Sequence, residues 1–285
     1  MSRLKIAIQK SGRLNEESLK LLRSCGLAIN NGKDQLKVVV DNFPIDLLYL
    51  RNSDIPQYIE DGTADLGIIG ENLLIEKQTN IPTIRKLGFS KCRVSLAVPK
   101  DVEATNINYL NGKRIATSYP VTLKKYLDEN QIEADIHTIS GSVEIAPSIG
   151  LADGICDIVS SGSTLFKNGL VETQVILKSQ AVLVKSNKLT SNQEAILERL
   201  LFRIDAVQRG KNSKYILLNV PNDKIEGVAA ILPVLKSPTI LPLAKKGWSS
   251  LHSVIEENKF WDVIDELKTA GAEDILIIPI DKMVI

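Results

Sequence analysis

One segment of the chain has the residue types of a phosphate-binding turn. The apolar run at 155–159 reads as a strand, and small or hydroxyl-bearing residues follow it at 160–164, before Leu165 and Phe166 begin a short helical stretch. Small residues at a strand-to-helix turn let backbone N–H groups converge on an anion, and hydroxyls add further donors. The segment predicts a phosphate cradle, although a plain surface turn has the same composition.

Acidic residues stand close to this turn in the sequence. Asp157 lies inside the apolar strand, Asp153 lies four residues earlier, and Glu144 lies further upstream. A carboxylate beside a phosphate is repulsive unless it binds sugar hydroxyls or a bridging cation, and a ribose phosphate offers both. Asp153 could equally be solvated at a helix end, and Glu144 could complement a helix N-terminus. Asp157, with isoleucines around it, predicts a sugar contact most directly.

The overall composition limits which other chemistry is open to the chain. Its 285 residues carry a net charge of +1, only two histidines, and three cysteines without metal-site spacing. A histidine triad or a multi-histidine metal centre would therefore have almost nothing to be built from, and near-neutral charge argues against non-specific nucleic-acid binding. No apolar run approaches the ~20 residues that span a bilayer, and the N-terminus lacks the apolar stretch of a secretory signal. We expect a cytoplasmic protein with no membrane segment.

Two series of alternating strands and helices must position these residues. The first occupies the N-terminal third, the second begins near Arg93, and a strand at 181–185 is expected to return to the first. We predict lobe I at 1–92 with 180–212 and lobe II at 93–179, with a small-molecule cleft between them. A helix is expected over 143–152.

A long helix and a compact C-terminal segment complete the chain. The helix is predicted to begin with a capping box formed by Ser191 and Glu194. Residues 213–285 then have the order βαββαβ, the split pattern of ferredoxin-like domains. The predicted fold is α/β: a two-lobed periplasmic-binding-protein-like unit followed by a ferredoxin-like regulatory domain.

The segment around the turn resembles the signature of ATP phosphoribosyltransferases, the enzymes that open histidine biosynthesis. That signature is a Glu, a Gly six residues on, an Asp seven further, then a small residue, Gly, any residue, Thr and Leu. The matching positions are Glu144, Gly150, Asp157, Ser161, Gly162, Thr164 and Leu165. The likeness extends from QKSGRL near the start to SPTILPLA near the end, so it covers essentially the whole chain.

The resemblance implies an active site in the cleft, with Arg13, Asp157 and Thr164 central to catalysis. The implied phosphoribosyl pyrophosphate site comprises Glu144, Asp153, Asp157, Ser160, Ser161, Gly162, Ser163, Thr164 and Leu165. The implied site for ATP or pyrophosphate comprises Lys10, Ser11, Gly12, Arg13, Arg51, Glu71, Lys91, Arg93 and Tyr119, with Asn72 beside it. An isolated charge among these could instead be a surface ion-pair partner, and Tyr119 could stack on a base or simply pack.

The implied reaction is attack of adenine N1 of ATP on C1 of the ribose, with inversion and no covalent intermediate. Mg²⁺ would enter with the pyrophosphate, and no general base is identified. The long form of the family is inhibited by histidine and forms homo-oligomers from dimers to hexamers; AMP is a candidate competitor of ATP. The implied histidine site comprises Asn219, Leu235, Thr239, Val254 and Asp274. Asn219 stands where some relatives have an acid, which puts the strength of inhibition in doubt.

A non-catalytic small-molecule binder or regulatory paralogue is the alternative reading of the same pattern. Two α/β lobes also occur in solute-binding proteins and in effector domains of transcription regulators, so fold alone does not decide. The C-terminal domain could likewise serve only oligomerisation. The intact turn and Arg13 favour the enzyme.

Overall fold

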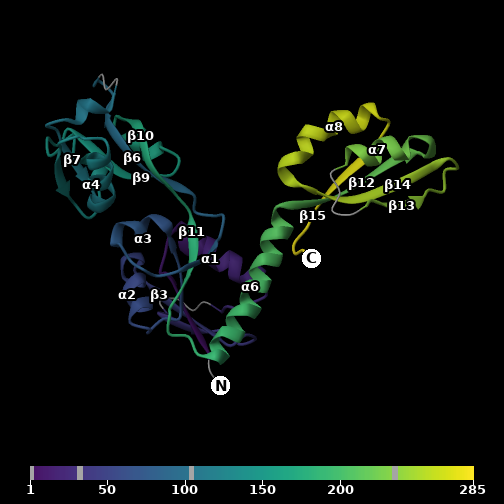
Figure 1. Cartoon of the computed structure of the whole chain (residues 1–285), viewed down its shortest axis with the longest axis horizontal. Coiled ribbons are helices and arrows are strands. Elements are labelled where there is room, and N and C mark those ends of the chain that lie inside the picture. Colours follow the sequence, from purple (N-terminus) through teal and green to yellow (C-terminus); the bar gives the residue numbers. More distant parts are fainter. Residues whose placement is uncertain (1–2, 31–34, 103–105, 233–236) are drawn as a thin grey trace. The chain divides into compact units, whose positions relative to one another are not determined.

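The structure is a computed structural model that describes residues 3–30, 35–102, 106–232 and 237–285. The chain forms two compact units. The first consists of Met1–Lys20 with Leu27–Ile196, and the second of Leu21–Gly26 with Leu197–Ile285. Figure 1 shows the elements of both units in sequence colours.

The first sheet of the larger unit, sheet A, has the strand order β2-β3-β1-β4-β11-β5. Strands β3, β1 and β4 are parallel, whereas β2 and β11 run antiparallel to their neighbours. The central strands are almost wholly apolar because helices and loops cover both faces. The strands are β1 (Leu4–Gln9), β2 (Lys37–Val39), β3 (Ile45–Leu50), β4 (Leu66–Gly70), β5 (Thr83–Lys86) and β11 (Ala181–Lys185); the helices are α1 (Arg13–Ser24), α2 (Ile55–Glu60) and α3 (Glu71–Lys77), with a 3₁₀ turn at Asn52–Asp54.

The second sheet, sheet B, has the order β10-β6-β9-β7-β8. Its strands are β6 (Cys92–Pro99), β7 (Arg114–Thr117), β8 (Asp135–Thr138), β9 (Gly154–Val159) and β10 (Leu170–Ser179), with helices α4 (Pro120–Glu129) and α5 (Ser163–Lys167) and a 3₁₀ turn at Ile107–Leu110. The prediction of a helix over 143–152 is wrong, because only a 3₁₀ turn, Val143–Ile145, forms there. Pro147 removes a helical N–H donor, and Gly150 adopts a φ of +75°.

The chain passes from sheet A to sheet B and back again. It leaves sheet A after β5, builds all five strands of sheet B, and returns as β11, which pairs with both β4 and β5. This return of the chain was expected from the sequence. The two α/β sheets are therefore connected by two passages of the chain rather than one. Sheet B is therefore an insertion within sheet A.

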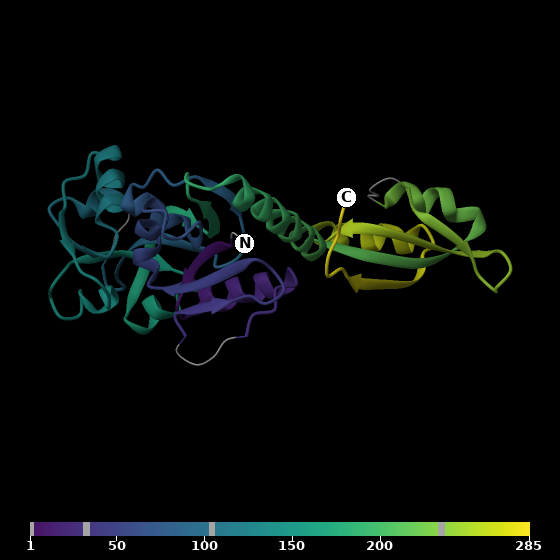
Figure 2. The same ribbon diagram turned by 90° about the horizontal axis from the view of Figure 1, so that it is seen from below.

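The C-terminal part has the predicted order βαββαβ. Its elements are β12 (Ser213–Pro221), α7 (Ile225–Ile231), β13 (Thr239–Pro242), β14 (Trp248–Glu256), α8 (Phe260–Thr269) and β15 (Glu273–Pro279), with 3₁₀ turns at Asn222–Lys224 and Glu257–Lys259. They form an antiparallel sheet of order β13-β14-β12-β15. Alternate residues of β12, such as Ile216 and Leu218, are buried with Leu251 and Leu267. Helices α7 and α8 lie on the same side of this sheet (Figure 2), which confirms the ferredoxin-like arrangement.

The long helix α6 (Ser191–Lys211) is capped one residue earlier than expected. Thr190 N–H donates to Gln193 Oε1 at 3.0 Å, and Gln193 N–H donates back to Thr190 Oγ1 at 3.4 Å. Glu194 instead binds Lys185 at 2.8 Å. The predicted Ser191/Glu194 box is wrong because Thr190/Gln193 has the same residue types and spacing.

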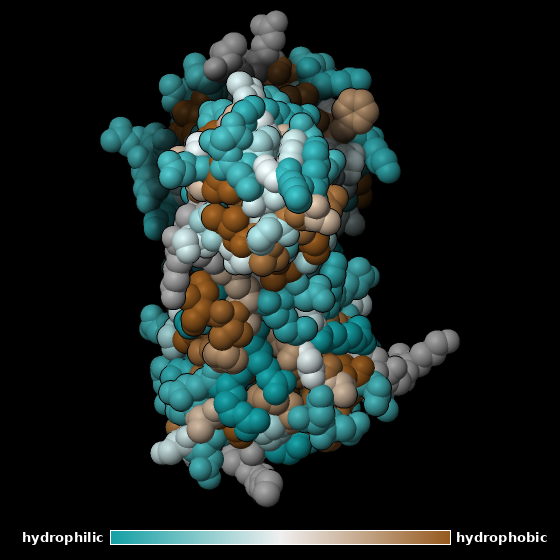
Figure 3. All heavy atoms as spheres, turned by 90° about the vertical axis from the view of Figure 1, so that its right-hand side faces the viewer, coloured by the Kyte–Doolittle hydropathy of each residue, from teal (hydrophilic) through white to brown (hydrophobic). Residues whose placement is uncertain are grey.

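The face of the C-terminal sheet that α7 and α8 do not cover carries apolar side chains. Leu241, Leu276 and Ile278 are about half exposed. Figure 3 shows one side of the molecule, on which hydrophobic side chains form patches between polar ones. Among the described residues, no helix combines the length and the apolar character needed to cross a bilayer.

Candidate active site

The predicted phosphate-binding turn joins β9 to α5. Gly162 has a φ of +81°, where L side chains are strained, so the backbone itself favours glycine here. The hydroxyls of Ser161 and Ser163 lie 3.0 Å apart, and Thr164 is exposed. Leu165 is buried in the core of sheet B and anchors the start of α5. The turn therefore presents hydroxyl groups outward from a fixed backbone.

Asp157 lies in β9, near the end of the strand that leads into the turn. Burial raises the pKa of its carboxyl to about 6; the Ile158 N–H lowers it and the nearby charge of Glu144 raises it. The structure thus brings Glu144 close to Asp157, from the 3₁₀ turn at Val143–Ile145. A carboxylate that is costly to ionise would gain from ligand hydroxyls that donate to it.

Asp153 is not brought to the turn. It lies just before β9, whereas the turn follows the other end of that strand. Arg114 Nη2 binds its Oδ1 at 3.0 Å, and Arg114 N–H donates to Oδ2 at 2.9 Å, which lowers the pKa of Asp153. Its carboxylate ties β7 to β9 and lies apart from the turn that was expected to bind ribose with it.

Arg13 reaches the turn from the other sheet. It begins α1, and its guanidinium donates from Nη1 to Ser160 Oγ and from Nη2 to the Lys91 carbonyl at 3.1 Å. Its nearest carboxylate, Glu17, lies 3.9 Å away, too far for a strong hydrogen bond. Arg13 therefore bridges sheet A to the turn of sheet B.

Further predicted residues lie at the carboxyl ends of parallel strands of sheet A. Lys10 follows β1 and Arg51 follows β3, and the Lys10 N–H donates to the last carbonyl of β3 at 2.8 Å. Both side chains are exposed, as are Ser11 and Gly12 at the start of α1. These four residues share the sheet edge from which Arg13 extends, as ligand-binding residues of open α/β sheets commonly do.

A cavity of about 440 Å³ lies beside Arg13 and the turn. Four of its lining residues were predicted: Glu71, Lys91, Arg93 and Ser160. The others are Lys86, Cys92, Lys178, Ser179 and Gln180. Of the four cations, Lys86 binds Glu71 at 3.1 Å and Arg93 binds Glu172, so Lys91 and Lys178 leave the wall with an excess of positive charge. Such a wall suits a polyanionic ligand.

Arg93 is held by Glu172, a residue that sequence reasoning missed. The ion pair is bidentate, with Nε–Oε1 and Nη2–Oε2 distances of 2.5 Å, and it raises the pKa of Arg93 and lowers that of Glu172. Arg93 Nη1 also donates to the Ser160 carbonyl at 3.0 Å. Glu172 and Lys178 come from β10, which pairs with β6, so only knowledge of that strand register would have placed them here.

Tyr119 lies where β7 leads into α4. Its hydroxyl accepts a hydrogen bond from Asn72 Nδ2 at 3.2 Å. Burial, and then the nearby charge of Asp157, raise the pKa of the Tyr119 hydroxyl. Tyr119 is therefore close to Asp157, and its hydroxyl is neutral near pH 7.

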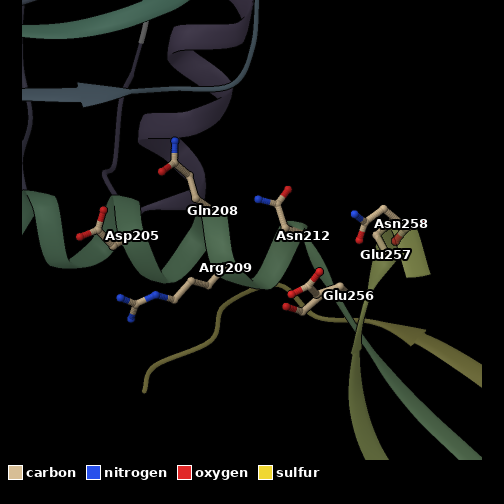
Figure 4. Close-up of a pocket in the computed structure, with 8 residues that line it drawn as sticks. Asp205, Gln208, Arg209, Asn212, Glu256, Glu257 and Asn258 are labelled. Atoms are coloured by element: carbon tan, nitrogen blue, oxygen red, sulfur yellow. The ribbon is translucent and has the colours of Figure 1, made fainter. Parts of the chain in front are cut away.

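Two larger concavities contain none of the predicted residues. One, of about 860 Å³, lies along α3 and α4. The other, of about 810 Å³, is in the C-terminal unit; Figure 4 shows side chains of α6 and of the end of β14 around it. Its lining mixes Asp205 and Glu256 with Arg209 and neutral amides. The smaller cationic cavity beside the turn is therefore the candidate active site.

Four of the five predicted effector residues are described, and they lie on the C-terminal sheet. Asn219, on β12, donates from Nδ2 to Asp274 Oδ2 at 3.0 Å, and Asp274 has a φ of +48°. Thr239 begins β13, and Val254 lies on β14 opposite Tyr215, on the same face as Asn219. Leu235 lies outside the described residues. An acidic group therefore does accompany Asn219.

No set of three or more His, Cys, Asp or Glu side chains is placed to hold a metal ion within the described ranges.

Comparison with known proteins gives consistent matches along the chain. The family model described as ATP phosphoribosyltransferase matches residues 51–206, and the model described as HisG, C-terminal domain, matches residues 210–282. The ATP phosphoribosyltransferase of Cytophaga hutchinsonii is 57% identical over 281 residues, covering 99% of this chain and 98% of its own. That of Bacteroides thetaiotaomicron is 51% identical over 282 residues, covering 99% and 100%.

A solved structure matches most of the chain in fold. It is the ATP phosphoribosyl transferase (HisG:HisZ) complex from Thermotoga maritima, with a TM-score of 0.60 and 29% identity. The match covers 70% of this chain and 95% of that chain.

Proposed function

Because the chain belongs to the ATP phosphoribosyltransferase family, in its long form, we propose that the turn at 160–165, Asp157 and Arg13 form its active site. The family reaction transfers phosphoribose from phosphoribosyl pyrophosphate to ATP and opens histidine biosynthesis. The enzymatic prediction is thereby confirmed over the non-catalytic alternative. The observation that carries the site assignment is the reach of Arg13 from sheet A to Ser160 in the turn of sheet B.

We propose that the turn binds the 5′-phosphate while the acids bind the ribose. Ser161, Ser163 and Thr164 supply hydroxyls, and Asp157 with Glu144 accepts hydrogen bonds from the ribose hydroxyls. Asp153 is left out, because Arg114 holds it at the far end of β9. Two substrates held in this orientation would react with little further loss of entropy, which is a major source of rate enhancement.

The cationic wall is assigned to the leaving group and to the ATP phosphates. Adenine N1 attacks C1, the C1–O bond to pyrophosphate breaks, and negative charge grows on the departing oxygens. Arg13, Lys91, Arg93 and Lys178 surround that position with fixed positive charge. Lys10 and Arg51, at the strand ends, are proposed to bind the triphosphate of ATP. Adenine N1 is already a lone-pair nucleophile, so the step needs no general base.

Mg²⁺ is proposed to enter with phosphoribosyl pyrophosphate. Phosphate oxygens are the hard ligands that Mg²⁺ prefers, and Glu71 is the carboxylate in the cavity wall that could complete its coordination. When bound, the ion would neutralise charge that builds on pyrophosphate. We expect the reaction to take place in the cytoplasm.

The test of this function is a direct assay of the purified chain. Incubated with ATP, phosphoribosyl pyrophosphate, Mg²⁺ and pyrophosphatase, it should yield N1-phosphoribosyl-ATP, seen by the changed ultraviolet absorbance of the adenine and by mass spectrometry. Omission of either substrate is the control. Absence of product from folded protein would refute the proposal.

We propose a separate role for each of three parts of the chain. Residues 1–92 with 180–212 form lobe I, residues 93–179 form lobe II with the turn, and residues 213–285 form the regulatory domain.

The open apolar face of the C-terminal sheet is proposed to take part in homo-oligomers, from dimers to hexamers. Light scattering after gel filtration would measure their size, and AMP should compete with ATP.

Histidine is proposed to inhibit by binding beside Asn219, Thr239, Val254 and Asp274. The Asp274 carboxylate, which accepts from Asn219, can also accept from the α-ammonium group of histidine. Asp274→Asn should therefore raise the half-inhibitory concentration of histidine by about tenfold, the worth of one charged hydrogen bond. Inhibition curves and the fluorescence of Trp248 and Trp261 are the measurements. Glu273→Gln, at the neighbouring exposed carboxylate, is the matched control; equal curves for both variants would contradict the assignment.

A further inference from the structure

A carboxylate of sheet A's helix α3 caps a helix of sheet B. Glu76 accepts three hydrogen bonds from the first turn of α4: from Val121 N–H to Oε1 at 2.9 Å, and from Thr122 N–H and Oγ1 to Oε2 at 2.9 and 2.8 Å. Thr122 is buried and Glu76 is partly buried. Both oxygens of Glu76 are therefore committed to the other sheet.

Helix α4 has no cap of its own that could replace Glu76. It begins at Pro120, and its N-cap residue Tyr119 makes no side-chain capping bond. The first N–H groups of a helix lack partners within the helix, and a carboxylate there also interacts favourably with the helix dipole. An N-cap is usually supplied by a residue adjacent in sequence. Here it comes from 45 residues away, across the two sheets.

The same face of α3 also holds Tyr119. Asn72, one turn before Glu76, donates to the Tyr119 hydroxyl at 3.2 Å. Asn72 is buried and fixed by Ser179, the last residue of β10: its N–H donates to Ser179 Oγ at 3.0 Å, and Ser179 Oγ donates to its Oδ1 at 2.8 Å. Any side chain at position 70 would crowd it, since a Cβ on Gly70 would lie 2.4 Å from Asn72 Oδ1.

We propose that Glu76 is a positioning residue for phosphoribosyl transfer: by capping α4 from the other sheet, it fixes Tyr119 beside Asp157 and sets the separation of the two sheets at the active site. Asp157 is in sheet B and the turn follows its strand β9, whereas Arg13 begins α1 and Lys10 follows β1 of sheet A. A transfer between two substrates needs these groups in register within a fraction of an ångström. The inference rests on the active site proposed above.

Variants at both partners test the proposal. Glu76→Ala should lower kcat by about 10- to 100-fold, the range that follows from misplacing reacting groups by about 1 Å. Glu76→Gln keeps the shape but turns an amide N–H₂ toward a donor, so it should lose part of the activity. Thr122→Val removes one bond and Thr122→Ser retains it. In the double variant Glu76→Gln/Thr122→Val the losses in kcat should be less than additive.

A pH profile separates positioning from general stability. Loss of the cap should displace Tyr119 and let water reach Asp157 beside it, so the acid limb of kcat/KM should move to lower pH in Glu76→Ala, and by less in Glu76→Gln. A variant that is merely less stable would keep the wild-type limb. Glu129→Gln, at the exposed end of α4, is the matched control and should change neither kcat nor the limb.

The outcomes separate this inference from the proposed function. If the wild-type chain makes no product, the function itself fails. If the wild-type chain turns over and the Glu76 and Thr122 variants match it in kcat and in pH profile, the positioning role is overturned. If Glu76→Ala does not fold, Glu76→Gln and Thr122→Val decide, because each keeps at least part of the cap.

Discussion

Replacing Asp157 with asparagine is expected to lower kcat/KM for phosphoribosyl pyrophosphate by about 100-fold or more, the worth of one or two hydrogen bonds to a charged group. The carboxylate stands at the end of β9 beside the turn, with Glu144 nearby. Since its pKa is about 6 in the empty protein, wild-type kcat/KM should fall as the pH drops below 6, where the carboxylate protonates. The asparagine variant should lack that limb. A variant with near-wild-type kcat/KM and an unchanged limb would refute the assignment.

The same substitution should stabilise the fold at neutral pH. The folded pKa of Asp157 lies above its ordinary value of 3.8, so between these values the folded state binds more protons than the unfolded state. Stability therefore falls as the pH rises toward 6, at a cost on the order of 3 kcal/mol above it. Asp157→Asn should remove that cost at pH 8 and give no gain below pH 4. Urea unfolding at both pH values measures this.

Asp153→Asn is a control in which the change in stability should have the opposite sign to that of Asp157→Asn. Its pKa is lowered by Arg114, so its contribution is present above pH 3.8 and is lost as the pH falls further. The substitution should therefore destabilise the protein at pH 8. If both variants shifted stability in the same direction, the electrostatic account of Asp157 would be wrong.

Replacing Arg13 with alanine is expected to lower kcat by about 100- to 1,000-fold, as removal of a donor to developing negative charge does in other enzymes. Its guanidinium reaches Ser160 and the Lys91 carbonyl, between the turn and the cationic cavity. Arg13→Lys keeps the charge but loses the planar fork, so it should recover only part of the activity. Steady-state kinetics with both substrates provide the measurement.

A matched control for Arg13 exists on the same helix. Lys20 is an exposed cation of α1, and Lys20→Ala should leave kcat near the wild-type value. Affinity for pyrophosphate as a product inhibitor should fall in Arg13→Ala and stay unchanged in Lys20→Ala. If Arg13→Ala kept kcat and pyrophosphate affinity near wild type, Arg13 would be a surface cation only.

The alternating apolar runs predicted the sheets because a buried strand and an amphipathic helix have different periods. The turn was equally readable, since its glycine, hydroxyls and Asp157 lie within a few residues of one another. The contacts of Arg93 were not readable, because Glu172 reaches it from a strand 79 residues away whose register no local pattern reveals. The capping role of Glu76 was also missed, because its partners in α4 lie 45 residues away in the sequence and no local pattern brings the two helices together.

Two further predictions, the place of Asp153 in the site and the helix over 143–152, differ from the structure. Asp153 and Asp157 are four residues apart in the sequence, which suggested a single site. In the structure they lie toward opposite ends of β9. Asp153 is in an ion pair with Arg114, and Asp157 is a separate carboxyl group beside the turn. Residues 143–152 carry apolar side chains at helical spacing, but Pro147 and Gly150 interrupt the backbone. Backbone constraints outweighed the side-chain pattern.

The insertion of sheet B within sheet A bears on how the chain is made. Among the described residues, strand β5 pairs only with β11, and about 95 residues separate the two strands. At ~5 to 20 residues per second, β5 would emerge from the ribosome roughly 5 to 20 s before its partner. Four of the five strands of sheet B, and the turn after β9, are made in this interval before β10, so most of sheet B can pair before β11 closes sheet A. A nascent chain stalled so that residues up to 179 have left the ribosome, with β11 still inside it, should therefore resist protease within sheet B while β5 stays cleavable.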